Sequence, residues 1–128
     1  MLRGADGIPD EVLIFQLDDR RFGVPLAAVR EVLPSLASEP LPGAPGAIEG
    51  VIDVRGEVVP VVDVRARLGL GARAISIADH IVVARAGDRT VGLRADRALG
   101  LARVPAGAFA GAEGITALEA PVAGVARL

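Results

Sequence analysis

Short runs of aliphatic and β-branched residues, separated by polar turns, form the main pattern of this chain. Residues 12–17 are apolar except for Gln16, residues 18–21 are polar, and apolar and small residues then alternate through 22–26. A period of two is the pattern of a half-buried strand, because successive side chains of a strand point to opposite faces. The first segment therefore predicts a β-hairpin.

The strongest strand signal lies on either side of Gly56. Residues 48–54 and 58–64 are both rich in Val and Ile, and the segment 55–57 between them is polar apart from the glycine. Glycine supplies the positive φ that a tight hairpin turn needs. Because Pro60 cannot donate a ladder hydrogen bond, its strand is expected to have an edge or a bulge at that point.

A helical period occurs only once, and briefly. Val29, Val32 and Leu33 are spaced at i, i+3 and i+4, and Pro34 follows them. This spacing is typical of an amphipathic helix, and a proline ends such a helix. The pattern predicts a short helix over 27–33.

The remainder of the chain also favours strands. Residues 80–85 and 90–93 flank a polar turn and predict a third hairpin, whereas 95–101 is compatible with a short helix or a continuing strand. The other expected segments are a helical turn at 65–70, a loop at 105–121 and the beginning of a strand at 122–128.

An internal repeat divides the chain into two parts. The sequence DRRFGV at 19–24 matches DRTVGL at 88–93, and a looser match relates IEGV at 48–51 to VAGV at 122–125. We interpret the chain as one domain made of two related segments. The domain spans residues 1–128, and the segments lie at about 11–70 and 80–128.

The second segment stops where its last hairpin turn would begin. The first segment continues beyond Gly50 into a strong return strand, but the chain ends at Leu128. Residues 122–128 are therefore expected to present an unpaired strand edge, through which the protein could associate with another copy.

Composition excludes several kinds of chemistry. The chain has 128 residues, a formal net charge of −2, no Cys and one His, and all of its 14 basic residues are Arg. Without Cys there is no disulfide framework, thiolate nucleophile or Cys-based zinc site, and without Lys there is no Schiff-base chemistry. Slight acidity and an aromatic content of 2% argue against nucleic-acid binding. No metal or cofactor is expected.

No membrane-spanning segment is expected either. The chain contains no run of the roughly 18 uncharged apolar residues that such a helix needs. The N-terminal segment is polar and contains Gly and Pro. We therefore expect a soluble cytoplasmic protein without direct membrane insertion.

Two pairs of side chains deserve a test as catalytic groups. His80 follows Asp79, and such a pair can orient a base in a hydrolase. Asp53 and Asp63 lie on opposite arms of one predicted hairpin, and paired carboxylates can perform acid–base catalysis. Since no nucleophile or metal-ligand set accompanies His80, and hairpin carboxylates more often face solvent, the residues favour a small all-β interaction domain over an enzyme.

The chain resembles the CheW-like domain of bacterial chemosensory systems in three segments: LIFQLDDRRFGVPLAAVREVL at 13–33, LPGAPGAIEGVIDVRGEVVPVVDVRARLGL at 41–70, and DHIVVARAGDRTVGLRAD at 79–96. The most specific part is Pro-Gly-Ala-Pro followed by Gly-Val-x-x-x-Arg-Gly-x-x-x-Pro-Val-x-Asp. The resemblance covers almost the whole chain.

The resemblance implies a fold and a role. The fold would be all-β, with two small five-stranded β-barrel subdomains sharing a hydrophobic core and one or two short helices, the second barrel being incomplete at the C-terminus. The role would be that of a non-enzymatic chemotaxis adaptor, which binds the cytoplasmic tip of chemoreceptors and couples them to a CheA-type histidine kinase in receptor arrays.

An alternative stays open because family members usually continue into another strand and a terminal helix. On that alternative, the protein is a short receptor-only connector that has lost kinase binding.

The same resemblance assigns receptor-contact residues. They are Arg55 of the Arg-Gly turn, Glu31 of the Val-x-Glu-Val motif and Val29 of that same motif. Without the resemblance, Arg55 and Glu31 are more simply explained as solvated surface residues, and docking is the second interpretation. The family usually has Asn-Leu before the Arg-Gly turn, where this chain has Asp53-Val54, and Asp53 is expected to pair with Arg55.

Overall fold

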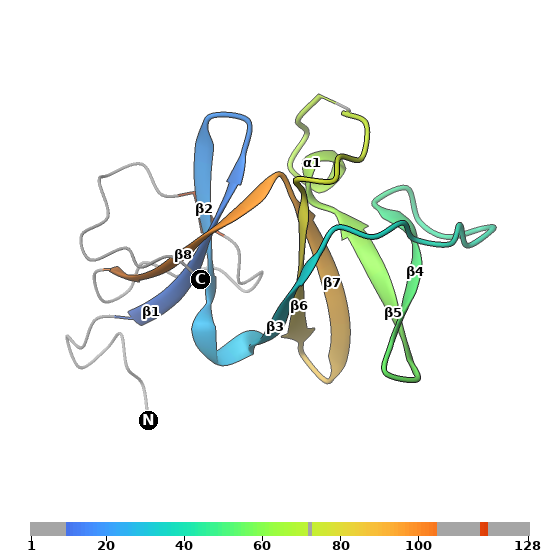
Figure 1. The fold of residues 1–128 in the computed structure, drawn as a ribbon, viewed down its shortest axis with the longest axis horizontal. Helices are drawn as coiled ribbons and strands as arrows, with labels where there is room; N and C mark the ends of the chain where they lie inside the picture. The colour runs from blue at the N-terminus through green and yellow to red at the C-terminus, as the bar shows by residue number, and fades with distance from the viewer. Residues whose placement is uncertain (1–9, 72, 105–115, 118–128) are drawn as a thin grey trace. The chain divides into compact units, whose positions relative to one another are not determined.

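The computed structural model describes residues 10–71, 73–104 and 116–117 of the chain (Figure 1). The chain divides into two compact units, which we describe separately. The terminal unit comprises Met1–Val29 and Ala98–Leu128, and the central unit comprises Arg30–Arg97. The described residues are mostly strands, with one short α-helix and one 3-10 turn. The predicted all-β fold with two sheet subdomains is therefore confirmed.

The terminal unit contains the predicted first hairpin. Its strands pair antiparallel, and Phe15 lies opposite Phe22, with their rings stacked at a centroid distance of 5.6 Å. Both rings are buried, so this pair forms part of the core of the unit. The sheet has the order β8-β1-β2-β9, with β1 at Asp10–Leu17, β2 at Arg20–Pro25, β8 at Arg97–Val104 and β9 at Thr116–Ala117.

The predicted helix over 27–33 is wrong. The structure has a 3-10 turn at Leu26–Ala28 followed by strand β3 at Val29–Pro34. Two of the residues that created the helical spacing are valines, whose branched side chains fit a strand better than a helix. A segment of seven residues is also too short to be stable as a helix by itself, whereas β6 offers it hydrogen-bonding partners.

The central unit is built on one five-stranded sheet in the order β3-β6-β7-β5-β4. Strand β5 runs parallel to β7 and antiparallel to β4, while β6 and β7 form an antiparallel hairpin. The tips of the β4–β5 and β6–β7 hairpins therefore lie at the same end of the sheet (Figure 1). The bounds are Ile48–Val54 for β4, Glu57–Asp63 for β5, His80–Ala86 for β6 and Arg89–Ala95 for β7.

The core of the central unit is aliphatic. Its buried cluster joins the inward-facing residues of β4 and β5 to those of β6, with Leu33 of β3 packed against it. The members of the cluster are Ile52, Val54, Val59, Val61, Ile81 and Val83. Along each strand these residues alternate with less buried ones, which is the period of two of a strand with one face in the core.

Two backbone features of β4 and β5 follow from single residues. Pairing of β5 with β7 begins at Val61, directly after Pro60, which confirms the predicted edge at the proline. On the other side of the hairpin, the backbone of Glu39 bridges Val51 of β4. A Cβ on Gly50 would lie 2.3 Å from the carbonyl oxygen of Glu39, so only glycine lets this loop approach the strand.

Short connections follow β5 and β7 at the end of the central sheet opposite the hairpin tips. Helix α1 (Val64–Arg67) begins after Asp63, whose carboxylate accepts a hydrogen bond from the Ala66 amide at 3.3 Å. This agrees with the helical turn expected from residue 65. For residues 95–101 the strand alternative is correct, since β7 ends at Ala95 and β8 begins at Arg97.

The structure tests the predicted barrels only in part. The described strands form sheets of four and five strands and no closed barrel. The predicted edge at 122–128, the looser repeat match at 122–125 and the incomplete C-terminal end of the second barrel all lie outside the described residues. The two repeated hairpins, β1–β2 and β6–β7, belong to different units.

Candidate docking site

The β4–β5 turn holds Arg55 in a defined orientation. The strands pair up to Val54 and Glu57, so the turn consists of two residues, Arg55 with a φ of 50° and Gly56 with a φ of 88°. Positive φ at both positions is typical of a type I′ turn, which matches the twist of the strands. The Asp53 carboxylate accepts a hydrogen bond from the Gly56 amide at 2.7 Å.

Asp53 therefore does not have the role predicted from the sequence. We expected it to pair with Arg55, but its carboxylate oxygen binds the backbone of the turn instead. Short carboxylate and amide side chains often bind backbone amides two or three residues ahead in this way. The change from Asn to Asp thus leaves the turn with an equivalent acceptor.

Arg55 and Glu31 form a two-pronged ion pair. Nη1 of Arg55 donates to Oε1 of Glu31 at 3.1 Å, and Nη2 donates to Oε2. The hydrogen bond from Arg55 is the main reason why the pKa of Glu31 lies below its ordinary value, and the charges of Arg55 and Arg30 act in the same direction. The structure thus brings together two residues that the family resemblance assigned separately, one from β3 and one from the tip of the β4–β5 hairpin.

A second ion pair lies beside the first. Nη1 of Arg30 is 2.9 Å from Oε1 of Glu57 and 3.4 Å from the hydroxyl oxygen of Thr90 on β7. The hydrogen bond from Arg30 is the largest cause of a lowered pKa at Glu57. We call Arg30, Glu31, Arg55 and Glu57 the charge quartet. Together its two pairs connect β3, at one edge of the central sheet, with the hairpin formed at the other edge.

Sequence analysis missed Arg30 and Glu57. Both lie close to a predicted receptor-contact residue, since Arg30 precedes Glu31 and Glu57 follows Arg55 by two positions. Both segments carry Arg before Glu, so two crosswise pairs could form between them. This signal was unusable because residues 27–33 were assigned to a helix.

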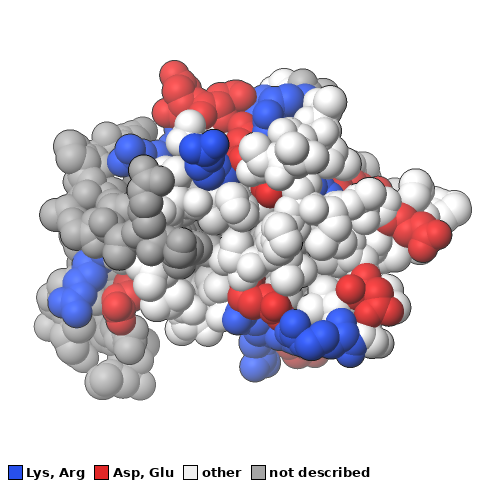
Figure 2. Space-filling view, viewed as in Figure 1, with Lys and Arg blue, Asp and Glu red and all other residues white. Residues whose placement is uncertain are grey.

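The surface around the charge quartet also exposes an apolar side chain. Val58 stands opposite Asp53 in the hairpin and is 68% exposed. Figure 2 shows charged side chains of both signs gathered along the lower edge of the central unit, where the hairpin tips lie. Val29, the third predicted contact residue, is the half-buried first residue of β3, and its role in docking stays a prediction.

Asp79 serves the structure of a loop. It is buried, and its two carboxylate oxygens bind Arg73 at 2.8 Å and the Ser76 amide at 2.9 Å. Nη1 of Arg94 on β7 also lies 3.9 Å from this carboxylate. Asp53 and Asp63 likewise bind backbone amides of a turn and a helix.

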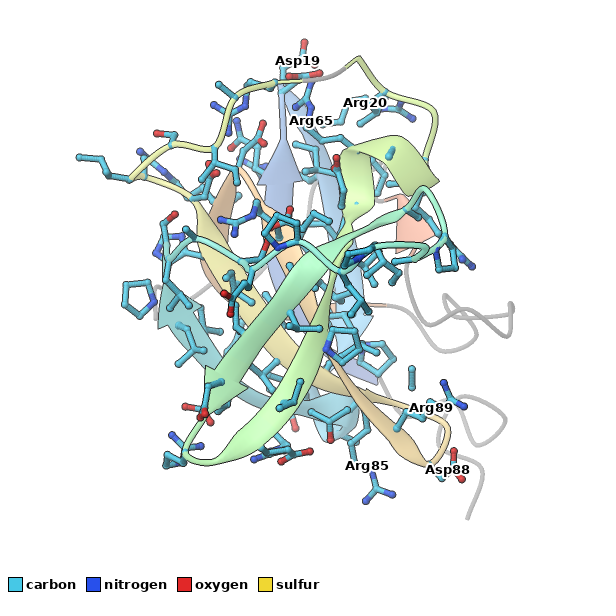
Figure 3. All side chains as sticks on the ribbon, turned by 90° about the vertical axis from the view of Figure 1, so that its right-hand side faces the viewer. Asp19, Arg20, Arg65, Arg85, Asp88 and Arg89 are labelled. Carbon is cyan, nitrogen blue, oxygen red and sulfur yellow. The ribbon has the colours of Figure 1, made fainter. Side chains whose placement is uncertain are left out.

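A polar cavity of about 340 Å³ lies at the end of the central sheet where α1 begins. Figure 3 shows Arg65 at this end, and Arg85, Asp88 and Arg89 at the opposite end, around the tip of the β6–β7 hairpin. The charged side chains of the cavity pair with one another across its wall; they include Glu49, Arg65, Arg73, Asp79, Arg94 and Asp96. Among the described residues, no cluster of His, Cys, Asp and Glu could hold a metal ion.

The comparison with protein families decides what kind of domain carries this site. The model of the CheW-like domain matches residues 11–128. The chain belongs to the CheW-like family. It is 41% identical over 86 residues to the chemotaxis protein CheW of Rhizobium meliloti, covering 67% of this chain and 56% of that protein. It is 40% identical over 95 residues to FrzA of Myxococcus xanthus, covering 74% and 59%.

A solved structure agrees with the family. The scaffolding protein TtCheW from Thermoanaerobacter tengcongensis superposes with a TM-score of 0.69 at 28% identity, covering 77% of this chain and 66% of that one. The names of the Rhizobium protein and of TtCheW denote a chemotaxis protein and a scaffolding protein, and neither denotes an enzyme. This CheW-like chain spans under three fifths of the length of the two curated relatives described above.

One finding concerns membranes. In the ranges that the structure describes, no helix has the length and apolar character needed to cross a bilayer.

Proposed function

We propose that this CheW-like protein is a non-enzymatic adaptor of a bacterial chemosensory array in the cytoplasm. It binds the cytoplasmic tip of a chemoreceptor and couples it to a CheA-type histidine kinase. The observation that carries the proposal is the two-pronged Arg55–Glu31 pair, because it unites the two charged positions that the family resemblance assigns to receptor contact. Family membership and the names of the relatives support it.

The physical properties of the site suit a helical protein partner. The Arg55 side chain is 66% exposed although it is paired, so its guanidinium has donors available to an acidic side chain of the partner. Val58 offers an apolar contact beside these charges. An exposed arginine next to an apolar side chain is the composition from which energetically dominant interface contacts are commonly made.

Co-sedimentation tests the proposal. Receptor cytoplasmic fragments, CheA-type kinase and the full chain are mixed, with Arg55→Ala in parallel and Arg89→Ala as a matched control. Arg89 is an exposed arginine on the other hairpin at the same end of the sheet. We expect the wild type and Arg89→Ala to sediment with receptor and to recruit kinase, and Arg55→Ala to lose about ten-fold or more of this binding.

The same experiment distinguishes the alternative role. If the protein sediments with receptor but leaves kinase in solution, it is a receptor-only connector. If the wild type fails to bind receptor at all, or if Arg89→Ala is as damaging as Arg55→Ala, the proposed docking site is wrong. Self-association through 122–128 is a separate prediction, and a strict monomer in light scattering would contradict it.

A further inference from the structure

Glu57 has two arginines within electrostatic reach. It binds Arg30 at 2.9 Å, and beyond that bond the charge of Arg55 also lowers its pKa. In the same way, Glu57 helps to raise the pKa of Arg55, after the larger effects of Glu31. Glu57 directly follows the two-residue turn that carries Arg55, so its carboxylate is a candidate second acceptor for that guanidinium; in the structure this carboxylate binds Arg30 at 2.9 Å.

We propose that Arg30 is a positioning residue, which binds Glu57 and so leaves the guanidinium of Arg55 paired with Glu31 alone. Without Arg30, the carboxylate of Glu57 would compete with Glu31 for Arg55. The guanidinium would then be divided between an orientation over β3 and one over β5. Arg30 does not touch the partner in this scheme; it determines which orientation of Arg55 the partner meets.

Three features of the geometry support this role. Arg30 contacts Glu57 on β5 and Thr90 on β7 at the same time, so its guanidinium is fixed from two strands. The side chains of Glu57 and Arg30 are 48% and 35% exposed, so burial does not hold the Glu57 carboxylate in place and it can turn to another cation when Arg30 is removed. Arg55 sits at a two-residue turn with a defined backbone, so side-chain pairing is what decides its direction.

The pairing itself is tested on the free protein. The carboxyl group of Glu31 is titrated by NMR in the wild type, Arg30→Ala, Glu57→Gln and the double variant. Arg30→Ala should raise the pKa of Glu31 towards its ordinary value, because Arg55 is then shared. Adding Glu57→Gln should lower the pKa of Glu31 again because the competing carboxylate is gone. The pKa should not return fully to its wild-type value, because the charge of Arg30 is still missing. Glu57→Gln alone should have a smaller effect.

The result that would overturn the inference is additivity. If Glu57→Gln changes the pKa of Glu31 equally with and without Arg30, the charges act independently and there is no competition. Thermal unfolding of each variant checks that the sheet is intact. Arg30→Gln repeats the test with a milder change should Arg30→Ala fold poorly.

The consequence for binding rests on the proposed function. Arg30→Ala should weaken co-sedimentation with receptor fragments about two- to five-fold, the range of an exposed ion pair. Adding Glu57→Gln should restore most of the binding, while Arg89→Ala should not affect it. A double variant that binds worse than Arg30→Ala would contradict the positioning role. If the titrations show competition but no variant, Arg55→Ala included, alters receptor binding, the positioning role stands and the proposed function fails.

Discussion

The two ends of the central sheet carry the same kinds of ion pair in opposite surroundings. At the hairpin end, the side chain of Arg55 is 66% exposed and that of its partner Glu31 is 25% exposed. At the end where α1 begins, Arg94 is 8% exposed and its partner Glu49 is 15% exposed. Both arginines bind a carboxylate through two bonds, so the difference between them is burial.

Burial determines what each pair can do. Arg94 binds both oxygens of Glu49, the Leu36 carbonyl at 2.6 Å and the Ser35 hydroxyl at 3.3 Å, which ties β7 to β4 and to the loop after β3. A desolvated charge with so many partners has a structural role, because none of them can be released without a large cost. Arg55 can exchange its partner with water or with another protein at little cost.

Removing Arg94 should produce the largest effect on stability. Arg94→Ala leaves Glu49 without its buried cation and the Leu36 carbonyl without a donor. We expect a loss of about 3–5 kcal/mol in the free energy of unfolding, measured by urea denaturation. Arg85→Ala, which removes an exposed arginine of the β6–β7 hairpin, is the control and should change the midpoint only slightly. A similar loss in both variants would remove the contrast between buried and exposed arginines.

Replacing both members of the buried pair should be less harmful than removing one. In the variant Arg94→Leu with Glu49→Leu, neither member of the pair is left without its partner, and apolar side chains take up the space. We expect the free energy of unfolding to lie at least about 1 kcal/mol above that of Arg94→Ala. If the double variant is the less stable of the two, the bonds of Arg94 to the loop at Leu36 matter more than its charge balance.

The two ends also differ in how far the sequence could predict them. The hairpin arms followed from their β-branched Val and Ile residues, and the turn at Gly56 followed from the glycine, because both depend on local backbone preferences. Arg55 and Glu31 were found through the family motif. Their contact could not be predicted, since it joins residues 24 positions apart and depends on β3 being a strand.

The network around Arg94 was not predicted at all. Its closest contacts join β7 to residues 45, 58 and 59 positions away, and no local pattern encodes such pairings. The segment 90–93 before Arg94 predicted only a strand. Pairs of this kind become visible when the order of strands in the sheet is known.

Arg55→Lys should sharpen the contrast at the exposed end. Lysine keeps the positive charge but cannot make two parallel bonds to one carboxylate. We expect receptor co-sedimentation to fall several-fold, less than with Arg55→Ala, while the thermal midpoint stays within about 1 °C of the wild type. Arg89→Lys provides the matched control. Full binding by Arg55→Lys would show that charge alone, without the geometry of the pair, accounts for docking.

The smallest expected effect is a change of stability in acid, and its sign follows from the pairing. The pKa of Glu31 and the pKa of Glu57 lie below their ordinary value of 4.5 in the folded protein, chiefly because of the hydrogen bonds from Arg55 and Arg30. At pH values between the lowered pKa of each group and its ordinary pKa, the folded state therefore binds fewer protons than the unfolded state. The stabilisation is complete above about pH 5 and is lost as the pH falls through the lowered pKa values. Thermal midpoints should show a gap between the wild type and Glu31→Gln that is constant between about pH 7 and pH 5 and closes below about pH 4. A gap that persists at the lowest pH would mean that Glu31 stabilises the sheet through packing, and the exposed pair would then resemble the buried one.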